Sequence, residues 1–183
     1  MQFGLSIEQD IEKLVQGALS ADEKCKKRLY EMFSSKMYAV CLRYASNRDD
    51  ARDLLQEGFI KVFQNLQRYR GEGSFEGWIR RIVVNTCLEY IRRTVKDQYR
   101  TDLADAEDIH FDAHIYEGLQ VEVIMEAIQA LAPGYRTVFN LYVIEGYSHK
   151  EIAAMLNINE NTSKSQLARA RGVLQQQLLK LLK

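Results

Sequence analysis

The sequence predicts an all-α protein built of two small helical domains joined by an acidic linker. One proline and ten glycines among 183 residues are too few for a many-turned β fold. Apolar residues instead recur every three or four positions through most of the chain, which is the period of helices that bury one side. Hydrophobic residues make up 46% of the chain, which is typical of a globular protein and too many for a wholly disordered one.

Charge is distributed unevenly along a chain whose formal net charge is zero. Residues 61–100 hold nine bases and four acids, residues 101–126 hold eight acids and no Lys or Arg, and residues 149–183 hold six bases and two acids. Two basic segments separated by an acidic one fit a nucleic-acid-binding protein with two contact surfaces. Charged runs are also common as solvated faces, so the pattern alone leaves both interpretations open.

Residues 1–98 are expected to form the first domain. The run Asn47-Arg48-Asp49-Asp50 interrupts the apolar pattern and is a suitable cap for the third of its helices, and Ser6 with Gln9 resembles a capping box in the first. Gly58 lies on the apolar side of the third helix, which indicates close approach of a neighbouring helix. The apolar stripes that predict these helices cover residues 7–18, 25–44, 51–66 and from about 75 onward.

The helix that starts near residue 75 has two contrasting sides. Trp78 lies on the apolar side, which favours packing in the hydrophobic core over stacking on a base. The preceding loop, residues 71–74, lacks the lysine and the strand of a phosphate-binding loop. Basic and amide side chains occupy the other side and its edges: Arg80, Arg81, Asn85, Arg92 and Arg93.

Residues 99–120 are predicted to be an acidic linker, because they lack a sustained apolar stripe, and residues 121–183 to be the second domain. In that domain Ser148 and Glu151 match a capping box, and Asn157 suits a left-handed turn before the last helix.

A short capped helix, a turn and a longer helix form a helix-turn-helix pattern. The longer helix suits the major groove of DNA, where Arg and Lys can read guanine and small polar residues can approach closely. A basic C-terminal helix that merely complements its own dipole is the alternative. The residues that the longer helix is expected to expose are Asn161, Lys164, Ser165, Arg169 and Arg171.

Two stretches resemble one known family. DARDLLQEGFIKVFQNL followed by RYRGEGSFEGWIRRIVVNTCLEYIRR is similar to the promoter-binding core region of bacterial sigma factors. ALAPGYRTVFNLYVIEGYSHKEIAAMLNINENTSKSQLARAR is similar to their C-terminal helix-turn-helix. The two stretches lie within about residues 25–96 and 124–174, in family order. Their spacing, without a middle domain, resembles the extracytoplasmic-function (ECF, group IV) type.

The resemblance implies a sigma factor that binds core RNA polymerase and directs promoter recognition and opening. The first domain (region 2) would open the −10 element, with an unstacked base held by the loop of residues 71–74. The implied −10 contacts are Arg80, Arg81, Asn85, Arg92 and Arg93. The second domain (region 4) would read the −35 element, and its implied contacts are Asn161, Lys164, Ser165, Gln166, Arg169 and Arg171. The implied contacts to the polymerase clamp are Asp53, Gln56, Glu57 and Ile60.

Two positions depart from the family pattern. Ser163 stands where an apolar residue is frequent, and Gln166 stands where a base is frequent. Because glutamine can pair bidentately with adenine, Gln166 is itself an expected reader of bases. For Asp53 and Glu57 a solvated helix face is the alternative to docking.

The expected partners are core RNA polymerase, promoter DNA and an anti-sigma factor. No membrane insertion is expected, because no stretch of 18 apolar residues occurs, and the three separated cysteines favour a reducing cytoplasm. No nucleophile–base pair is visible, so an enzyme is not predicted, and neither is a cofactor. His110 and His114 have a spacing at which metal ligation is conceivable, but no metal site is predicted.

Two other function classes stay open. A stand-alone helix-turn-helix regulator would account for residues 121–183 and leave residues 51–93 unexplained. A helical interaction protein without DNA binding would leave both basic faces unexplained.

Overall fold

The computed structural model describes residues 2–94 and 121–181, and every regular element in these ranges is a helix. The all-α prediction is therefore confirmed. The predicted linker, residues 99–120, lies outside the described residues. The chain divides into two compact units, Met1–Cys87 and Leu88–Lys183. This division falls within one continuous helix, and the domain boundaries drawn from the sequence remain a prediction.

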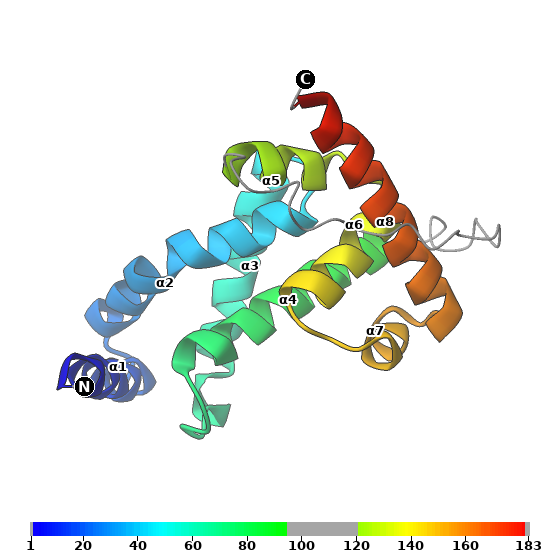
Figure 1. Ribbon diagram of the computed structural model, residues 1–183. Coiled ribbons are helices and arrows are strands. Elements are labelled where there is room, and N and C mark those ends of the chain that lie inside the picture. The colour runs from blue at the N-terminus through cyan, green and yellow to red at the C-terminus, as the bar shows by residue number, and fades with distance from the viewer. Residues whose placement is uncertain (1, 95–120, 182–183) are drawn as a thin grey trace. The chain divides into compact units, whose positions relative to one another are not determined.

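Two helices of the first unit, α2 and α3, begin at side-chain caps. Asp22 and Asn47 each accept a hydrogen bond at 2.8 Å from a backbone N–H in the first turn of the helix that follows. Within the run of residues 47–50 predicted to cap α3, Asn47 is therefore the residue that does so. The elements are α1 (Gln2–Leu19), α2 (Glu23–Tyr44), α3 (Arg48–Gln64), the 3₁₀ turn η1 (Leu66–Arg68) and α4 (Phe75–Thr94), which continues past the end of the unit (Figure 1).

The capping box predicted at Ser6 is wrong, because α1 begins at Gln2 and Ser6 lies inside the helix. The apolar pattern of the sequence already starts at Phe3, one helical turn before Ile7. The helix can therefore continue upstream of the Ser6–Gln9 pair, which has the spacing of a cap without its position.

Two contacts fix α4 in the first unit. A Cβ on Gly58 of α3 would lie 3.1 Å from Cγ2 of Val83, so the predicted close approach at Gly58 is confirmed. Phe75 lies edge-on to Phe33 of α2 and stacks on Trp78, with ring centroids 5.7 Å apart in both pairs. Trp78 thus packs within an aromatic cluster of its own unit, as its place on the apolar stripe predicts.

The second unit is also a bundle of helices. After the end of α4, its described elements are α5 (Val121–Gln129), α6 (Pro133–Phe139), the π-helical turn η3 (Asn140–Ile144), α7 (His149–Leu156) and α8 (Glu160–Leu181) (Figure 1). Pro133 is the first residue of α6. The N–H groups of the first helical turn have no acceptor within the helix, so the missing N–H of proline costs no helical hydrogen bond there. The hydrophobic core includes Ile128, Leu131, Val138, Leu141, Ile152, Leu156, Leu167, Ala170, Leu174 and Leu178.

Helices α7 and α8 form the predicted helix-turn-helix. The capping box at the start of α7 is complete, because Ser148 accepts from the Glu151 N–H and Glu151 accepts from the Ser148 N–H. Asn157 ends α7 in the left-handed conformation, with φ 54° and ψ 48°. Asn159 accepts a hydrogen bond at 2.6 Å from the Thr162 N–H and so caps α8.

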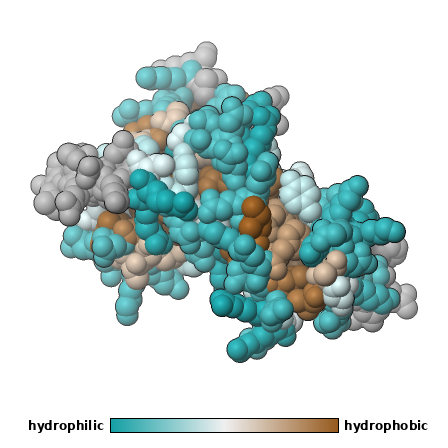
Figure 2. All heavy atoms as spheres, turned by 180° about the vertical axis from the view of Figure 1, so that it is seen from behind, coloured by the Kyte–Doolittle hydropathy of each residue, from teal (hydrophilic) through white to brown (hydrophobic). Residues whose placement is uncertain are grey.

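Within the described ranges, no helix has the length and apolar character needed to cross a membrane. Figure 2 shows one face of the molecule, on which hydrophilic residues predominate and hydrophobic residues gather in small patches.

Candidate nucleic-acid and polymerase interfaces

The basic side of α4 is exposed along most of its length. Arg81 and Asn85 lie one turn apart and both are exposed, and Arg92 lies two turns further along the same side. Arg80, at the edge of this face, is half-buried. The face thus offers guanidinium groups for phosphates, with the Asn85 amide between them for a base edge.

The basic side of α4 also carries an acid. Glu89 is exposed, and its Oε2 lies 3.7 Å from Nη2 of Arg93. The Arg93 Nε also donates to the Glu89 carbonyl oxygen at 3.4 Å. Because the ion pair is at the surface it is weak, and Arg93 could exchange it for a phosphate at little cost.

The loop between η1 and α4 has a defined shape. Gly71 and Gly73 have φ of 74° and 85°, values that favour glycine. The Tyr69 hydroxyl donates to the Gly73 carbonyl oxygen at 3.1 Å, and Ser74 Oγ accepts from the Gly77 N–H at 3.1 Å. These bonds anchor both ends of the loop, so its backbone is set before any ligand arrives.

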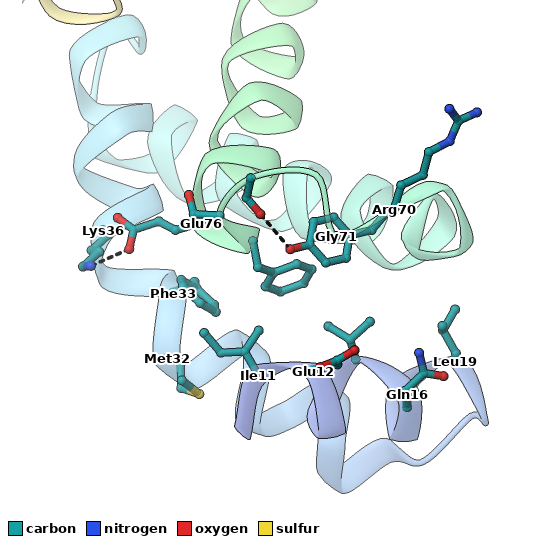
Figure 3. A pocket seen from close by; sticks show the side chains of 15 residues that line it. Ile11, Glu12, Gln16, Leu19, Met32, Phe33, Lys36, Arg70, Gly71 and Glu76 are labelled. Atoms are coloured by element: carbon teal, nitrogen blue, oxygen red, sulfur yellow. Dashed lines mark hydrogen bonds and ion pairs between the residues drawn. The ribbon is translucent and has the colours of Figure 1, made fainter. Parts of the chain in front are cut away.

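The same loop walls a hollow of about 850 Å³ against α1 and α2 (Figure 3). Helix α1 contributes Glu12 and Gln16, and α2 contributes Phe33. Lys36 of α2 forms an ion pair with Glu76 of α4 at 2.6 Å on the rim. The lining combines an aromatic ring, hydrogen-bonding groups and charges, which is the chemistry that holds a flat heterocycle.

Helix α8 carries an outward stripe beyond its cap. Asn161 and Lys164 are exposed and Ser165 is half-buried, with its hydroxyl donating to the Thr162 carbonyl oxygen at 3.0 Å. Lys164 Nζ lies 2.8 Å from Glu160 Oε1, and this pairing holds the pKa of the Glu160 carboxyl below its usual value. The stripe therefore presents one amide, one ammonium and one hydroxyl group along the side of the helix that faces away from its unit.

Gln166 is not part of this stripe. Its side chain is only 4% exposed, and its Oε1 would lie 2.9 Å from a Cβ on Gly134 of α6. The prediction that Gln166 reads a base is therefore wrong for this conformation. The prediction was based on the chemistry of glutamine alone. In the helix, however, Gln166 lies on the same side as Leu167 and Ala170, which are both buried, so its side chain points inward as well.

Arg169 and Arg171 are half-buried and contact their own unit. Arg169 Nη1 lies 3.4 Å from the Tyr135 hydroxyl of α6, and the Arg171 guanidinium carbon lies 6.0 Å from the Tyr142 ring centroid. Both cations lie on the flank of the outward stripe, with their side chains partly held by aromatic residues.

Helix α3 exposes a stripe opposite its buried side. Asp53, Gln56 and Ile60 are exposed, and Ile60 retains 56% of its accessible surface. Glu57 is half-buried and its Oε1 lies 2.8 Å from Lys61 Nζ. An apolar side chain this exposed between polar ones marks a candidate contact with another protein.

Two features of these surfaces were missed at the sequence level. Ala168 lies on the outward stripe of α8, one turn after Lys164 and Ser165, where its methyl group suits contact with a thymine methyl. The helical period of the sequence places Ala168 on the same side as Lys164 and Ser165, so this pattern was sufficient to predict it. No sequence pattern could have found Glu12 and Gln16 beside the loop after η1, because that contact arises from packing of distant segments.

Two family models match the chain in the order of the two units. The model Sigma-70 region 2 matches residues 29–96, and the model Sigma-70, region 4 matches residues 122–174. The ECF RNA polymerase sigma factor SigE of Mycolicibacterium smegmatis is 33% identical over 162 residues, which cover 83% of this chain and 61% of that protein. The ECF RNA polymerase sigma-E factor of Haemophilus influenzae is 28% identical over 181 residues, which cover 92% of this chain and 95% of that protein.

Among solved structures, the fold is similar to that of the sigma factor RpoE of Bartonella quintana in complex with the anti-sigma factor NepR. The TM-score is 0.50 at 24% identity, and the match covers 86% of this chain and 98% of that chain.

A helical unit with a basic helix and a shaped loop, followed by a helix-turn-helix unit, defines a DNA-binding transcription protein with two contact surfaces. With both models matched in order, the chain belongs to the sigma-70 family of RNA polymerase sigma factors, and to its ECF type. Its function is that of the family, which is to direct RNA polymerase in promoter recognition at the start of transcription.

Proposed function

We propose that three surfaces of this sigma factor divide the work of initiation. The outward stripe of α3 docks on core RNA polymerase, α4 with its preceding loop holds the melted −10 strand, and α8 reads the −35 duplex. The domains that carry these surfaces span residues 1–98 and 121–183, joined by the linker of residues 99–120.

Holding melted DNA requires phosphate contacts next to a site for an unstacked base. Arg81, Asn85 and Arg92 supply an exposed phosphate and base-edge face on α4, with Arg80 and Arg93 at its edges. The loop at Gly71 and the hollow behind it supply the base site. The observation that carries this role is the meeting of an anchored loop with a hollow of about 850 Å³.

Reading the duplex is assigned to the outward stripe of α8. Asn161, Lys164 and Ser165 reach the groove, Ala168 lies close enough for apolar contact, and Arg169 and Arg171 bind phosphates on the flank. Gln166 is left out of this set because it is buried.

Docking on core RNA polymerase is assigned to Asp53, Gln56, Glu57 and Ile60 on α3. The 56% exposure of Ile60 supports this role, because burial of an apolar side chain stabilises an interface while its charged neighbours orient the partner.

An anti-sigma factor is proposed as a further partner. The sigma factor RpoE of Bartonella quintana was solved with such a protein, and the fold of this chain is similar to it. We also propose that the chain works in the cytoplasm, where its polymerase acts, and that it has no catalytic activity of its own.

Site-specific photo-cross-linking within the holoenzyme tests this division. A photoreactive side chain at position 85 should cross-link to single-stranded DNA of the opened −10 region. The same group at position 168 should cross-link to the −35 duplex. At Lys27, which is exposed on α2, it serves as the control and should give neither product. Cross-links of position 85 to duplex alone, or of position 168 to the melted strand, would contradict the assignment.

A further inference from the structure

A hydrogen bond joins the two helices of the helix-turn-helix through two residues that are not themselves among the predicted DNA contacts. His149 is the first residue of α7, and Ser163 lies in the first turn of α8. The His149 Nδ1 lies 2.9 Å from the Ser163 Oγ. Ser163 is 0% exposed, so its hydroxyl has no access to water as an alternative partner.

One face of the imidazole is also held. The His149 ring stacks on the Tyr142 ring of η3, with centroids 4.4 Å apart and planes at 21°. A single side chain therefore connects η3, α7 and α8. Because stacking fixes the plane of the ring and the hydrogen bond fixes its rotation, the imidazole has one orientation in this site.

We propose that His149 is a positioning residue for DNA reading, which sets the rotation and depth of the first turn of α8 through its hydrogen bond to Ser163. The inference rests on the proposed reading role of α8. Ser163 immediately precedes Lys164 and Ser165, and residues in one helical turn move as a body. A shift of Ser163 therefore moves both side chains in the groove, where base contacts depend on hydrogen-bond geometry.

The choice of residues supports positioning over simple packing. At position 163 this chain buries a hydroxyl group in the contact between α7 and α8. An apolar pair tolerates small sliding, whereas a buried hydroxyl group without a partner is destabilising, so the bond to His149 selects one register.

Charged groups on α8 surround the imidazole. Partial burial of the ring is the main cause that lowers the pKa of His149. The nearby Lys164 and, less strongly, Arg171 also lower this pKa, whereas Glu160 raises it. Lys150, the next residue of α7, also lowers the pKa of Glu160. His149 is thus neutral near pH 7, and its Nδ1 donates to or accepts from the Ser163 hydroxyl depending on the tautomer.

The test uses the full-length chain with core RNA polymerase and two duplexes. One is a promoter duplex that the parent holoenzyme selects from genomic fragments, and the other has the same composition with a scrambled −35 element. Ser163→Ala removes the hydroxyl group, His149→Phe keeps a ring for Tyr142 without the hydrogen bond, and His149→Asn keeps a hydrogen-bonding group near the position of Nδ1. Circular dichroism fixes a temperature at which every variant is folded.

We expect Ser163→Ala and His149→Phe each to lower the preference for the selected duplex by about three- to tenfold, the effect of one lost hydrogen bond. The variant that carries both Ser163→Ala and His149→Phe should lose no more of this preference than either single variant, because both substitutions remove the same hydrogen bond. His149→Asn should retain part of the preference. Arg28→Ala on α2, an exposed cation in the other unit, is the matched control and should leave it unchanged.

Folded single variants with the parent's preference would overturn the inference, as would additive losses in the double variant. A parent chain that binds both duplexes equally would overturn the reading role of α8 and this inference together.

The pH profile gives a second readout. Since the folded pKa of His149 is lowered, its contribution to stability is complete above about pH 6.5 and lost as the pH falls. The thermal midpoint of His149→Asn should fall less between pH 7 and pH 5 than that of the parent, and equal falls would also count against the role of the ring.

Discussion

Gly58 of α3 and Val83 of α4 lie so close that a Cβ atom added at position 58 would be closer to Val83 than ordinary van der Waals contact allows. A Cβ at position 58 would stand 3.1 Å from Val83 Cγ2 and 3.7 Å from its Cα. Both residues are buried. This contact joins the helix proposed to dock on the polymerase to the helix proposed to hold melted DNA.

Enlarging position 58 should therefore separate α3 from α4. Gly58→Val adds two methyl groups beyond the tight Cβ and should lower the free energy of unfolding by about 1–3 kcal/mol, the usual cost of overpacking. Val83→Ala in the same chain should restore part of the loss, because it removes the atom that clashes. Chemical denaturation of the parent, both single variants and the double variant measures this, and a double variant with the sum of the two losses would contradict the contact.

The helical fold was predictable because its signals are local. The stripe of α3 with Gly58, the cap at Asn47, the box at Ser148 and the turn at Asn157 all act within a few residues and all hold in the structure. Ser6 shows the limit of such signals, since the right spacing occurred inside a helix that started earlier.

The candidate site was less predictable because it depends on packing. Gln166 was chosen for its chemistry, yet the core of the second unit turns it toward Gly134. The bond between His149 and Ser163 spans fourteen residues and has no local signature. Likewise, only the tertiary fold brings Glu12 of α1 next to the loop at Gly71.

Removal of the polar groups on α4 should affect opening more than initial binding. Arg81→Ala and Asn85→Ala leave the fold intact, because both side chains are exposed. Permanganate footprinting should show weaker reactivity of −10 thymines, while nuclease footprinting should show that the −35 duplex remains protected. Lys27→Ala on α2 is the matched control. Normal opening together with weak initial binding would reverse the roles proposed for α4 and α8.

Ile60 should contribute to docking on core RNA polymerase. Ile60→Glu places a charge where burial against the partner is proposed, so co-elution with core RNA polymerase should fall by about tenfold or more. Leu179→Glu makes the same change at an apolar residue of the second unit that is 43% exposed, and should co-elute normally. Equal co-elution of both variants and the parent would remove α3 from the interface.

The capping box of α7 should make the second unit sensitive to acid. Hydrogen bonds from the Ser148 hydroxyl and then its N–H lower the pKa of Glu151. Its contribution to stability is therefore complete above the unfolded value of about 4.3 and is lost as the pH falls through the lower folded value. Thermal unfolding from pH 7 to pH 3 should show a smaller fall for Glu151→Ala than for the parent.

Ser148→Ala removes the cap itself, and should lower stability by about 1 kcal/mol at pH 7. It should also reduce the pH dependence, since Glu151 then loses its hydroxyl donor. A pH profile identical to that of the parent would show that the box does not contribute to the stability of α7.

The most direct measurement of the central claim is run-off transcription in vitro with purified core RNA polymerase and a library of genomic fragments. The chain together with core RNA polymerase should start transcripts at a limited set of sites that share two short elements upstream. Neither component alone should start transcription at those sites. Initiation at the same sites without the chain, or no specific initiation with both present, would contradict the account.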